Sequence, residues 1–132
     1  MTQLTPQDIV LQALQQVVAQ PQHQPAAIAA FFADDYRQTV DGQSLDYAQF
    51  VSHMALLKQI TRRMTLRVQA LAAQGDSVLS HHRVEVEKCD GTRSEIQVMA
   101  HFTLRDGKII ACDELTRQLS GDRADHDLGG RY

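Results

Sequence analysis

The stretch that determines the fold is residues 78–119, which read VLSHHRVEVEKCDGTRSEIQVMAHFTLRDGKIIACDELTRQL. Apolar and polar side chains alternate along it, which is the pattern of half-buried β-strands. Two breaks, Cys89-Asp90-Gly91 and Arg105-Asp106-Gly107, have the length and the final glycine of three-residue hairpin loops. Consecutive hairpins form an antiparallel meander. The expected strands are Val78–Lys88, Arg93–Leu104 and Lys108–Leu119.

Before this meander, apolar residues recur first mostly at the spacing of helices and then, from Met64, at every second position, as in a strand. The expected elements are a helix from Pro6 to about Pro21, a helix from about Pro25 to Phe32, a strand Asp35–Val40, a helix that begins near Ser44 or Asp46, and a strand from Met64 to the turn at Gly75-Asp76. Helices followed by a meander are typical of an α+β domain. Because strands of this length twist and coil, we expect a curved antiparallel sheet whose concave face and the helices enclose an apolar pocket.

The bulk composition narrows the class of protein. A chain of 132 residues with 43% hydrophobic residues has the size and apolar content of one ordinary domain, so we expect a single domain over residues 1–132. Its last residues, from about 120 to 132, are rich in Gly and Asp and are expected to be irregular. The net charge of −3, with both signs interspersed, argues against nucleic acid and membrane surfaces as partners. Without an apolar leader or span, the expected location is cytoplasmic.

The residue types that other chemistries need do not occur at the required spacing. Cys89 and Cys112 form no C-x-x-C pair, and no two histidines lie four residues apart on a predicted helix, so we expect no metal site. The sequence also contains no G-x-S-x-G elbow and no glycine-rich phosphate loop. A nucleophilic triad and a nucleotide site are therefore not predicted.

The hairpin lengths set a register for the three long strands. With three-residue loops, Val78 faces Phe102 in the first hairpin and Phe102 faces Ile110 in the second. One face of the sheet is then almost wholly apolar, and a shift by one residue would scatter its members over both faces. The expected apolar wall consists of Val78, Val84, Val86, Ile96, Val98, Ala100, Phe102 and Ile110.

Two ionisable side chains project from this apolar wall. In the same register His82 lies opposite Val98, and Val98 lies opposite Glu114. A histidine and a carboxylate in an apolar cleft are the groups that proton-transfer catalysis uses, whereas buried hydrogen bonding for structure alone is the alternative. If the second loop had two residues, Asp113 would face inward in place of Glu114. We therefore predict His82 and Glu114 as an acid–base pair, with Asp113 replacing Glu114 if the register shifts.

Side chains from the helices and the first strand complete the expected pocket. Tyr36 is a third candidate catalytic residue if its hydroxyl points inward, and packing in the core is the alternative. His53 lies about 100° around its helix from Met54, so it either joins the pocket or lies at the surface. Cys112 is expected to be an inert small hydrophobe. The expected ligand-binding residues are Val84, Val98, Ala100, Phe102, Cys112, Phe50 and Met54.

Four short motifs occur in a fixed order along the chain. They are Phe31-Phe32-Ala33-Asp34-Asp35-Tyr36, then Asp41-Gly42 followed by Ser44-Leu45-Asp46-Tyr47, then Phe102-Thr103-Leu104-Arg105-Asp106-Gly107-Lys108-Ile109, and finally Asp113-Glu114-Leu115-Thr116. In this order they resemble the nuclear transport factor 2-like superfamily, in particular its SnoaL-like polyketide cyclase branch. The resemblance implies a cone-shaped α+β barrel with a pocket between sheet and helices. It also implies a homodimer through the outer sheet face, and chemistry without a cofactor.

These features lead to three hypotheses for a protein that holds a small apolar molecule. The first is a cofactor-free isomerase, cyclase or hydratase, in which Glu114 is the general base and His82 or Tyr36 polarises a carbonyl group. The second is a module that binds a hydrophobic metabolite without turnover. The third is a dimeric interaction domain. The fold by itself does not choose among them.

Overall fold

The protein is described by a computed structural model, and the structure describes residues 4–131. Its strands are β1 (Phe32–Val40), β2 (Gln43–Leu45), β3 (Thr61–Gln74), β4 (Ser77–Lys88), β5 (Arg93–Arg105) and β6 (Lys108–Ser120). Its helical elements are α1 (Pro6–Ala13), the π-helical continuation η1 (Leu14–Val18), α2 (Pro25–Phe31), α3 (Tyr47–Ile60) and the 3-10 turn η2 (Arg123–Asp125). Within residues 4–131, none of the helices has the length and apolar character needed to cross a membrane.

Local side-chain hydrogen bonds explain where the helices begin. The Thr5 hydroxyl accepts from the backbone N–H of Asp8 at 3.2 Å, and the Asp46 carboxylate accepts from the N–H of Gln49 at 2.8 Å. Both are capping boxes, which satisfy donors that the first turn leaves unpaired. Of the two caps expected for α3, Asp46 is therefore the observed one. Ser44 belongs to the short strand β2, which the sequence did not reveal.

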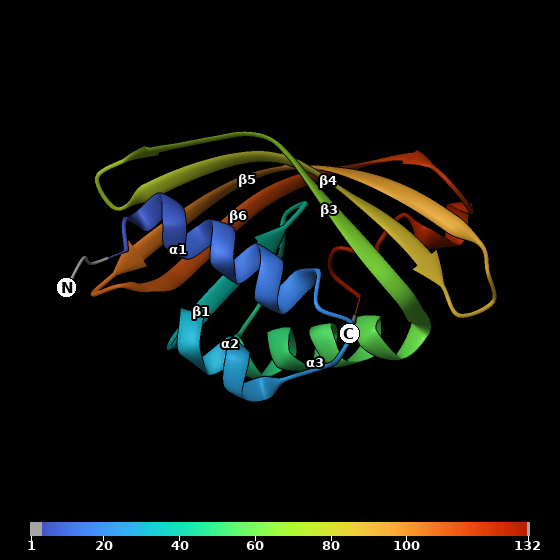
Figure 1. Ribbon diagram of the computed structural model, residues 1–132, viewed down its shortest axis with the longest axis horizontal. Coiled ribbons are helices and arrows are strands. Elements are labelled where there is room, and N and C mark those ends of the chain that lie inside the picture. Colours follow the sequence, from blue (N-terminus) through green and yellow to red (C-terminus); the bar gives the residue numbers. More distant parts are fainter. Residues whose placement is uncertain (1–3, 132) are drawn as a thin grey trace.

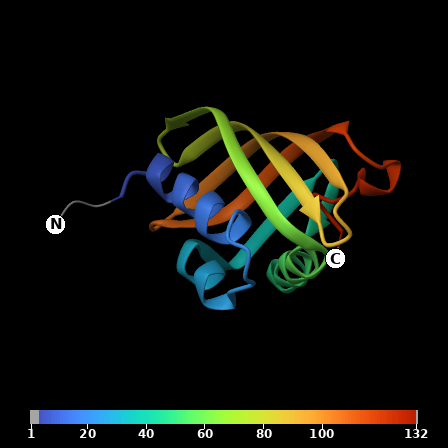
Figure 2. The ribbon, with the colours of Figure 1, turned by 45° about the vertical axis from the view of Figure 1, so that its right-hand side comes forward.

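The sheet has the strand order β2-β1-β6-β5-β4-β3, and the helices lie against its concave face (Figure 1). Figure 2 shows α3 nearly end-on beneath the curved strands. The prediction of a wholly antiparallel sheet was wrong, because β1 pairs with β6 in parallel. No hairpin joins these two strands, so the turn geometry that aligned the meander did not set their direction. In the described part of the chain the sheet stays open at β2 and β3, and the cone is completed by helices.

The first long hairpin has the predicted register. The N–H of Lys88 donates to the carbonyl of Thr92 at 2.8 Å, which closes a three-residue loop. Val78 therefore lies opposite Phe102, and His82 lies opposite Val98. All four of these inner-face side chains are buried.

The second long hairpin differs from the prediction in two ways that offset each other. Its turn has two residues, Asp106 (φ +52°) and Gly107 (φ +78°), rather than three. Leu104 then pairs with Ile109 while Thr103 pairs with Ala111, so Ile110 is the extra residue of a β-bulge. Ile110 is consequently not part of the inner wall, and the fully buried Ile109 takes that place.

The bulge decides which carboxylate points inward. The shorter turn moves the register by one residue, which alone would turn Asp113 toward the helices. The bulge moves it by one more, so Glu114 keeps the inner face and Asp113 is exposed. Glu114 lies opposite Ala100 rather than opposite Val98, whose observed partner is Thr116.

The C-terminal segment, residues 121–131, contains no regular secondary structure apart from the 3-10 turn η2, and it packs back against the sheet and the helices. Asp125, in η2, is 2% exposed, and its carboxylate accepts from Lys88 Nζ at 3.1 Å and from the Ser94 hydroxyl. Leu128 is buried in the main hydrophobic core. The buried Asp125 and Leu128 help to hold this segment of mostly polar and small residues in place, which composition alone does not reveal.

Gly121 is the point at which the chain leaves β6, and it should be intolerant of any side chain. Its φ is +112°, and a Cβ would lie 2.1 Å from the Ser94 hydroxyl oxygen and 2.8 Å from the Ser94 Cα. Gly121→Ala should lower the free energy of unfolding by about 3 kcal/mol in chemical denaturation, through strain and overlap together. The control Gly75→Ala also has a positive φ but open space around it, so it should cost only about 1 kcal/mol. Equal losses in the two variants would contradict the close approach of Gly121 to Ser94.

Candidate functional site

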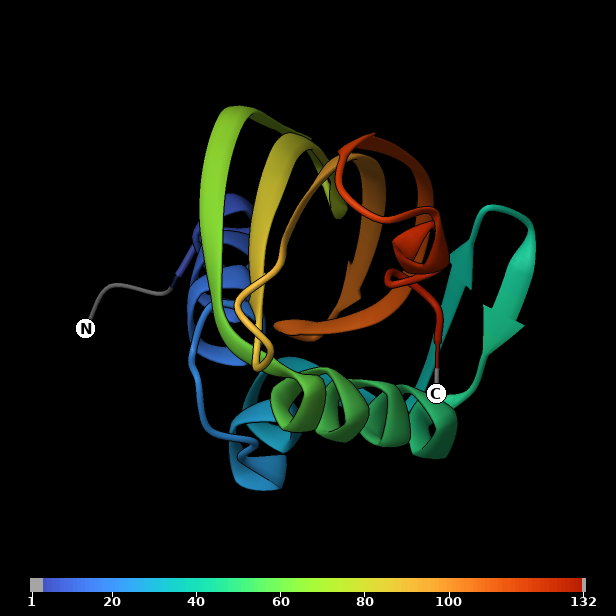
Figure 3. The same ribbon diagram turned by 90° about the vertical axis from the view of Figure 1, so that its right-hand side faces the viewer.

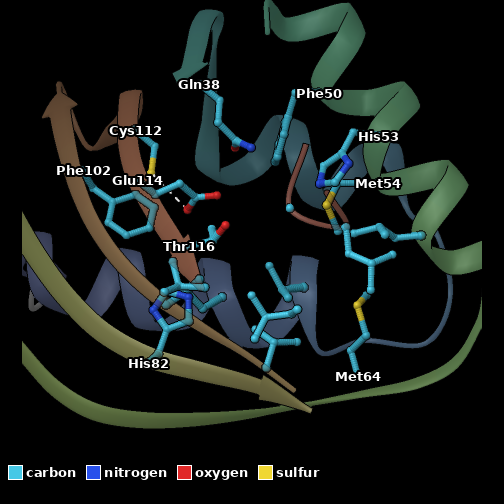
Figure 4. A pocket seen from close by; sticks show the side chains of 18 of the residues that line it. Gln38, Phe50, His53, Met54, Met64, His82, Phe102, Cys112, Glu114 and Thr116 are labelled. Carbon is cyan, nitrogen blue, oxygen red and sulfur yellow. Dashed lines mark hydrogen bonds between the residues drawn. The ribbon is translucent and has the colours of Figure 1, made fainter. Parts of the chain in front are cut away.

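An apolar cavity of about 110 Å³ lies between the concave face of the sheet and the helices. Its walls come from η1, β1, α3, the inner faces of β3 to β6, and the C-terminal segment. Figure 4 shows side chains of these elements converging on one space, with few polar atoms among them. A cavity thus lies where the curved sheet meets the helices.

Most of the predicted ligand-binding residues line this cavity. They are Val84, Val98, Phe102, Cys112, Phe50 and Met54. Ala100, the remaining predicted residue, is buried in the sheet and is not among the residues that line the cavity. Its methyl group is shorter than the side chains of Val98 and Phe102 beside it on β5 and of Glu114 opposite it on β6. The longer neighbours therefore form the surface that a ligand would touch.

Glu114 is the acidic group of the cavity. Its carboxylate points into the cavity from β6, and its Oε2 accepts from the Cys112 thiol at an Sγ–O distance of 3.8 Å (Figure 4). Burial among apolar side chains raises the pKa of Glu114 to about 7, and the nearby carboxylates of Asp41 and Asp113 add to this while the thiol contact opposes it. No cationic side chain within residues 4–131 is paired with it. Glu114 can therefore take up or release a proton near neutral pH.

His82 is the basic group of the same wall. It projects from β4, is 4% exposed, and its Nδ1 lies 2.7 Å from the Ser80 hydroxyl oxygen. Burial lowers the pKa of His82 to about 4, and the neighbouring His81 adds to this effect. The ring is thus neutral at physiological pH. Within the described residues its Nε2 has no protein partner, which leaves that atom for a ligand.

Tyr36 is buried at the end of the cavity, but its hydroxyl is already engaged. It donates to the Gln38 Oε1 at 2.7 Å, and the ring packs edge-on against Phe32 and Phe50. Burial, first of all, raises the pKa of Tyr36, with contributions from Cys112 and Glu114, so the hydroxyl stays protonated. Its hydrogen bond orients the Gln38 amide so that its nitrogen points into the cavity (Figure 4).

Gln38 is a polar lining residue that the sequence analysis missed. It is 5% exposed and lies on β1, two residues after Tyr36. Because successive side chains of a strand alternate between its faces, Tyr36 and Gln38 share one face. This alternation was the signal that could have identified it. Thr116 was missed although the same alternation places it on the inner face of β6, two residues after Glu114.

His53 belongs to the cavity rather than to the surface. It is 3% exposed, and its Nδ1–H donates to the backbone carbonyl of Arg131. Burial lowers the pKa of His53, and the hydrogen bond to Arg131 opposes this shift. The C-terminal segment is what covers this helix position, so the sequence of α3 alone left its exposure open.

The side chains that line the cavity are neutral, apart from the acidic Glu114. Among the described residues no group of three His, Cys, Asp or Glu side chains is arranged to hold a metal ion, and no Lys or Arg lines the cavity. Burial raises the pKa of the Cys112 thiol, with Glu114 adding to the shift, which keeps it protonated and poorly nucleophilic. The lining thus suits an uncharged ligand and proton transfer, rather than an anion or a covalent thiol adduct.

The partly buried Glu114 should make stability depend on pH in a specific window. Its folded pKa of about 7 is above the ordinary value of 4.5, so the folded state retains its proton longer than the unfolded chain does. The stability that this proton provides is complete below pH 4.5 and is lost as pH rises to about 7. Glu114→Gln should therefore change the free energy of unfolding little at pH 4.5 and raise it by about 3 kcal/mol at pH 8. Denaturation of both proteins across this range tests it, and a pH-independent difference would contradict the burial argument.

Comparison with known proteins identifies the family. The SnoaL-like domain family matches residues 11–112. An uncharacterized protein of Schizosaccharomyces pombe is 36% identical over 103 residues, which cover 78% of this chain and 79% of that protein.

Two solved structures illustrate the likeness in fold. IdmH of Streptomyces antibioticus, a proposed polyketide cyclase, has 16% identity and a TM-score of 0.70 over 88% of this chain and 93% of its own. An LEH-like epoxide hydrolase of M. tuberculosis has 15% identity and a TM-score of 0.70 over 95% of this chain and 88% of its own. The chain therefore belongs to the SnoaL-like domain family and has a nuclear transport factor 2-like α+β fold, as its ordered motifs predicted.

Proposed function

We propose that the protein is a cofactor-free enzyme that moves a proton on a small neutral substrate, as an isomerase, cyclase or hydratase does. The observation that carries this proposal is the Glu114 carboxyl group, which has a pKa of about 7 in an apolar cavity without a cationic partner among the described residues. A general base works best when its pKa is close to the working pH. A carboxyl group that had only a structural role would gain stability from a paired charge, which Glu114 lacks.

The cavity supplies the groups for proton abstraction next to a carbonyl. The Glu114 carboxylate takes a proton from the carbon beside the carbonyl, the C–H bond breaks, and its electron pair moves onto the carbonyl oxygen to give an enolate. Hydrogen bonds from the Gln38 amide and from Nε2–H of His82 stabilise that oxygen. This role needs the proton of the neutral ring on Nε2, and in that tautomer Nδ1 accepts from the Ser80 hydroxyl, which lies 2.7 Å away. Protonated Glu114 then returns the proton to another carbon, or the enolate attacks a second carbonyl and closes a ring.

This proposal gives His82 and Glu114 the roles expected from the sequence and changes the role of Tyr36. Because the Tyr36 hydroxyl donates to Gln38, we assign Tyr36 as a positioning residue for the amide. The fold likeness to a proposed cyclase and to an epoxide hydrolase is compatible with acid–base chemistry in this cavity, and it does not select the reaction. We expect the protein to act in the cytoplasm.

Hydrogen–deuterium exchange of a simple ketone tests the proposal without knowledge of the natural substrate. With cyclohexanone in D₂O, the protein should accelerate exchange of the protons beside the carbonyl, followed by NMR. The rate should rise with pH, with a midpoint near 7, because only the ionised Glu114 is a base. Glu114→Gln should lower the protein-dependent rate by about 100-fold or more.

Asp113→Asn is the matched control, because Asp113 is the next residue of β6 and lies on the exposed face. It should retain the wild-type rate and pH profile. Exchange that survives Glu114→Gln would refute the role of Glu114. Saturable binding of the ketone with no exchange above the protein-free rate would instead support the second hypothesis, a binding module for a hydrophobic metabolite.

We also propose that two copies associate through the outer face of the sheet. Leu79, Met99 and Leu115 point away from the helices and are 57%, 51% and 67% exposed. Met99 pairs directly with Leu115, and the three strands β4, β5 and β6 present these side chains together. A contiguous exposed apolar surface of this kind is typical of an interface.

Sedimentation velocity of charged variants tests the dimer. Leu115→Asp should convert it to a monomer, or raise its dissociation constant about 100-fold, because the interface would then bury an unpaired carboxylate. Leu4→Asp is the control, since Leu4 is similarly apolar and 49% exposed but lies outside this face. A wild-type protein that is monomeric at all concentrations would refute the proposal.

A further inference from the structure

The C-terminal segment forms one wall of the cavity. Figure 3 shows it, in red, between the curved sheet and α3. Leu128 is 3% exposed, and both Leu128 and Gly129 line the cavity. A Cβ on Gly129 would lie 3.4 Å from side-chain atoms of Thr116 and Val40, so the segment lies directly against β6 and β1.

Buried polar contacts hold this wall at both of its ends. Near its start, the Asp125 carboxylate binds Lys88 of β4 and Ser94 of β5, and Asp125 is 2% exposed. Near its end, the Arg131 carbonyl accepts a hydrogen bond from His53 of α3. The Arg131 side chain also pairs with Asp127 at 2.6 Å, which ties the segment to itself. Because breaking a buried ion pair is costly, the segment is a fixed wall rather than a loose tail.

We propose that the C-terminal segment limits the size of the ligand and that Leu128 is the side chain that sets this limit. This inference rests on the proposed function, because it concerns the ligand of the same cavity. The segment lies after residue 112, where the match to the SnoaL-like family ends.

The proposed limit on ligand size defines a class of substrate. An apolar cavity of about 150 Å³ binds benzene, and the cavity here, at about 110 Å³, is of similar size. No Lys or Arg lines it, and its polar groups Glu114, His82 and Gln38 lie on β6, β4 and β1. These features fit a neutral monocyclic or small branched compound with one carbonyl group. A polycyclic compound does not fit while Leu128 occupies its place.

Binding of two ketones of different size tests the inference. Isothermal titration calorimetry with cyclohexanone and with the bicyclic 2-tetralone should give a wild-type preference of at least tenfold for the smaller ketone. Leu128→Ala should reduce this preference by at least tenfold, because the removed side chain frees space for the second ring. Leu128→Val, which disturbs the core less, should give an intermediate preference if the alanine variant folds poorly. Leu119→Ala is the control, since Leu119 is partly exposed on β6 and does not line the cavity.

The outcomes separate this inference from the proposed function. A preference that is the same in the wild type, Leu128→Val and Leu128→Ala would overturn the size limit, and so would the absence of binding in all three. Ligand binding needs no turnover, so a size preference that shifts with Leu128 supports the limit even if Glu114→Gln leaves proton exchange unchanged. Conversely, exchange that depends on Glu114 while 2-tetralone binds the wild type as well as cyclohexanone would leave the proposed function intact and refute the limit.

Discussion

The backbone pairing between β5 and β6 is the interaction on which the rest of the structure depends. Side chains alternate between the two faces of a strand, so a net shift of one residue would turn every inward side chain of β6 outward. The two-residue turn and the bulge at Ile110 each shift the register by one, and together they preserve the inner face. The cavity consequently contains Glu114, whereas Asp113 is in solvent. One bulge thus determines both the hydrophobic wall and the position of its carboxyl group.

Burial then gives the two ionisable groups of the sheet opposite shifts from the same cause. An apolar surrounding disfavours charge, so it raises the pKa of Glu114 to about 7 and lowers the pKa of His82 to about 4. Between these values both groups are mostly neutral, and the cavity carries little charge. Near neutral pH, Glu114 gains its negative charge while His82 remains a neutral hydrogen-bonding group. An acid–base reaction needs such a pair of groups whose environments separate their pKa values.

The cavity is assembled from parts of the chain that are distant in sequence. The sheet supplies its apolar wall, β1 supplies Gln38, α3 supplies His53, and the C-terminal segment supplies Leu128. The buried Asp125 connects this last wall to β4 and β5 through Lys88 and Ser94. The fold shared with SnoaL-like proteins provides the framework, and residues outside the family match contribute to the shape of the cavity.

The α+β class, the three long strands, the first hairpin register and the inward direction of His82 follow from local rules. Alternation, glycine-containing loops and helix caps act between residues close in sequence, so the sequence by itself determined them. Only the tertiary structure decided four other features. These are the parallel pairing of β1 with β6, the bulge at Ile110, the hydrogen bond that engages Tyr36 with Gln38, and the covering of His53 by the C-terminal segment. The first and the last of these join segments that are distant in sequence. A bulge adds a residue without a sequence marker, and burial of His53 requires a chain end that returns from 78 residues away.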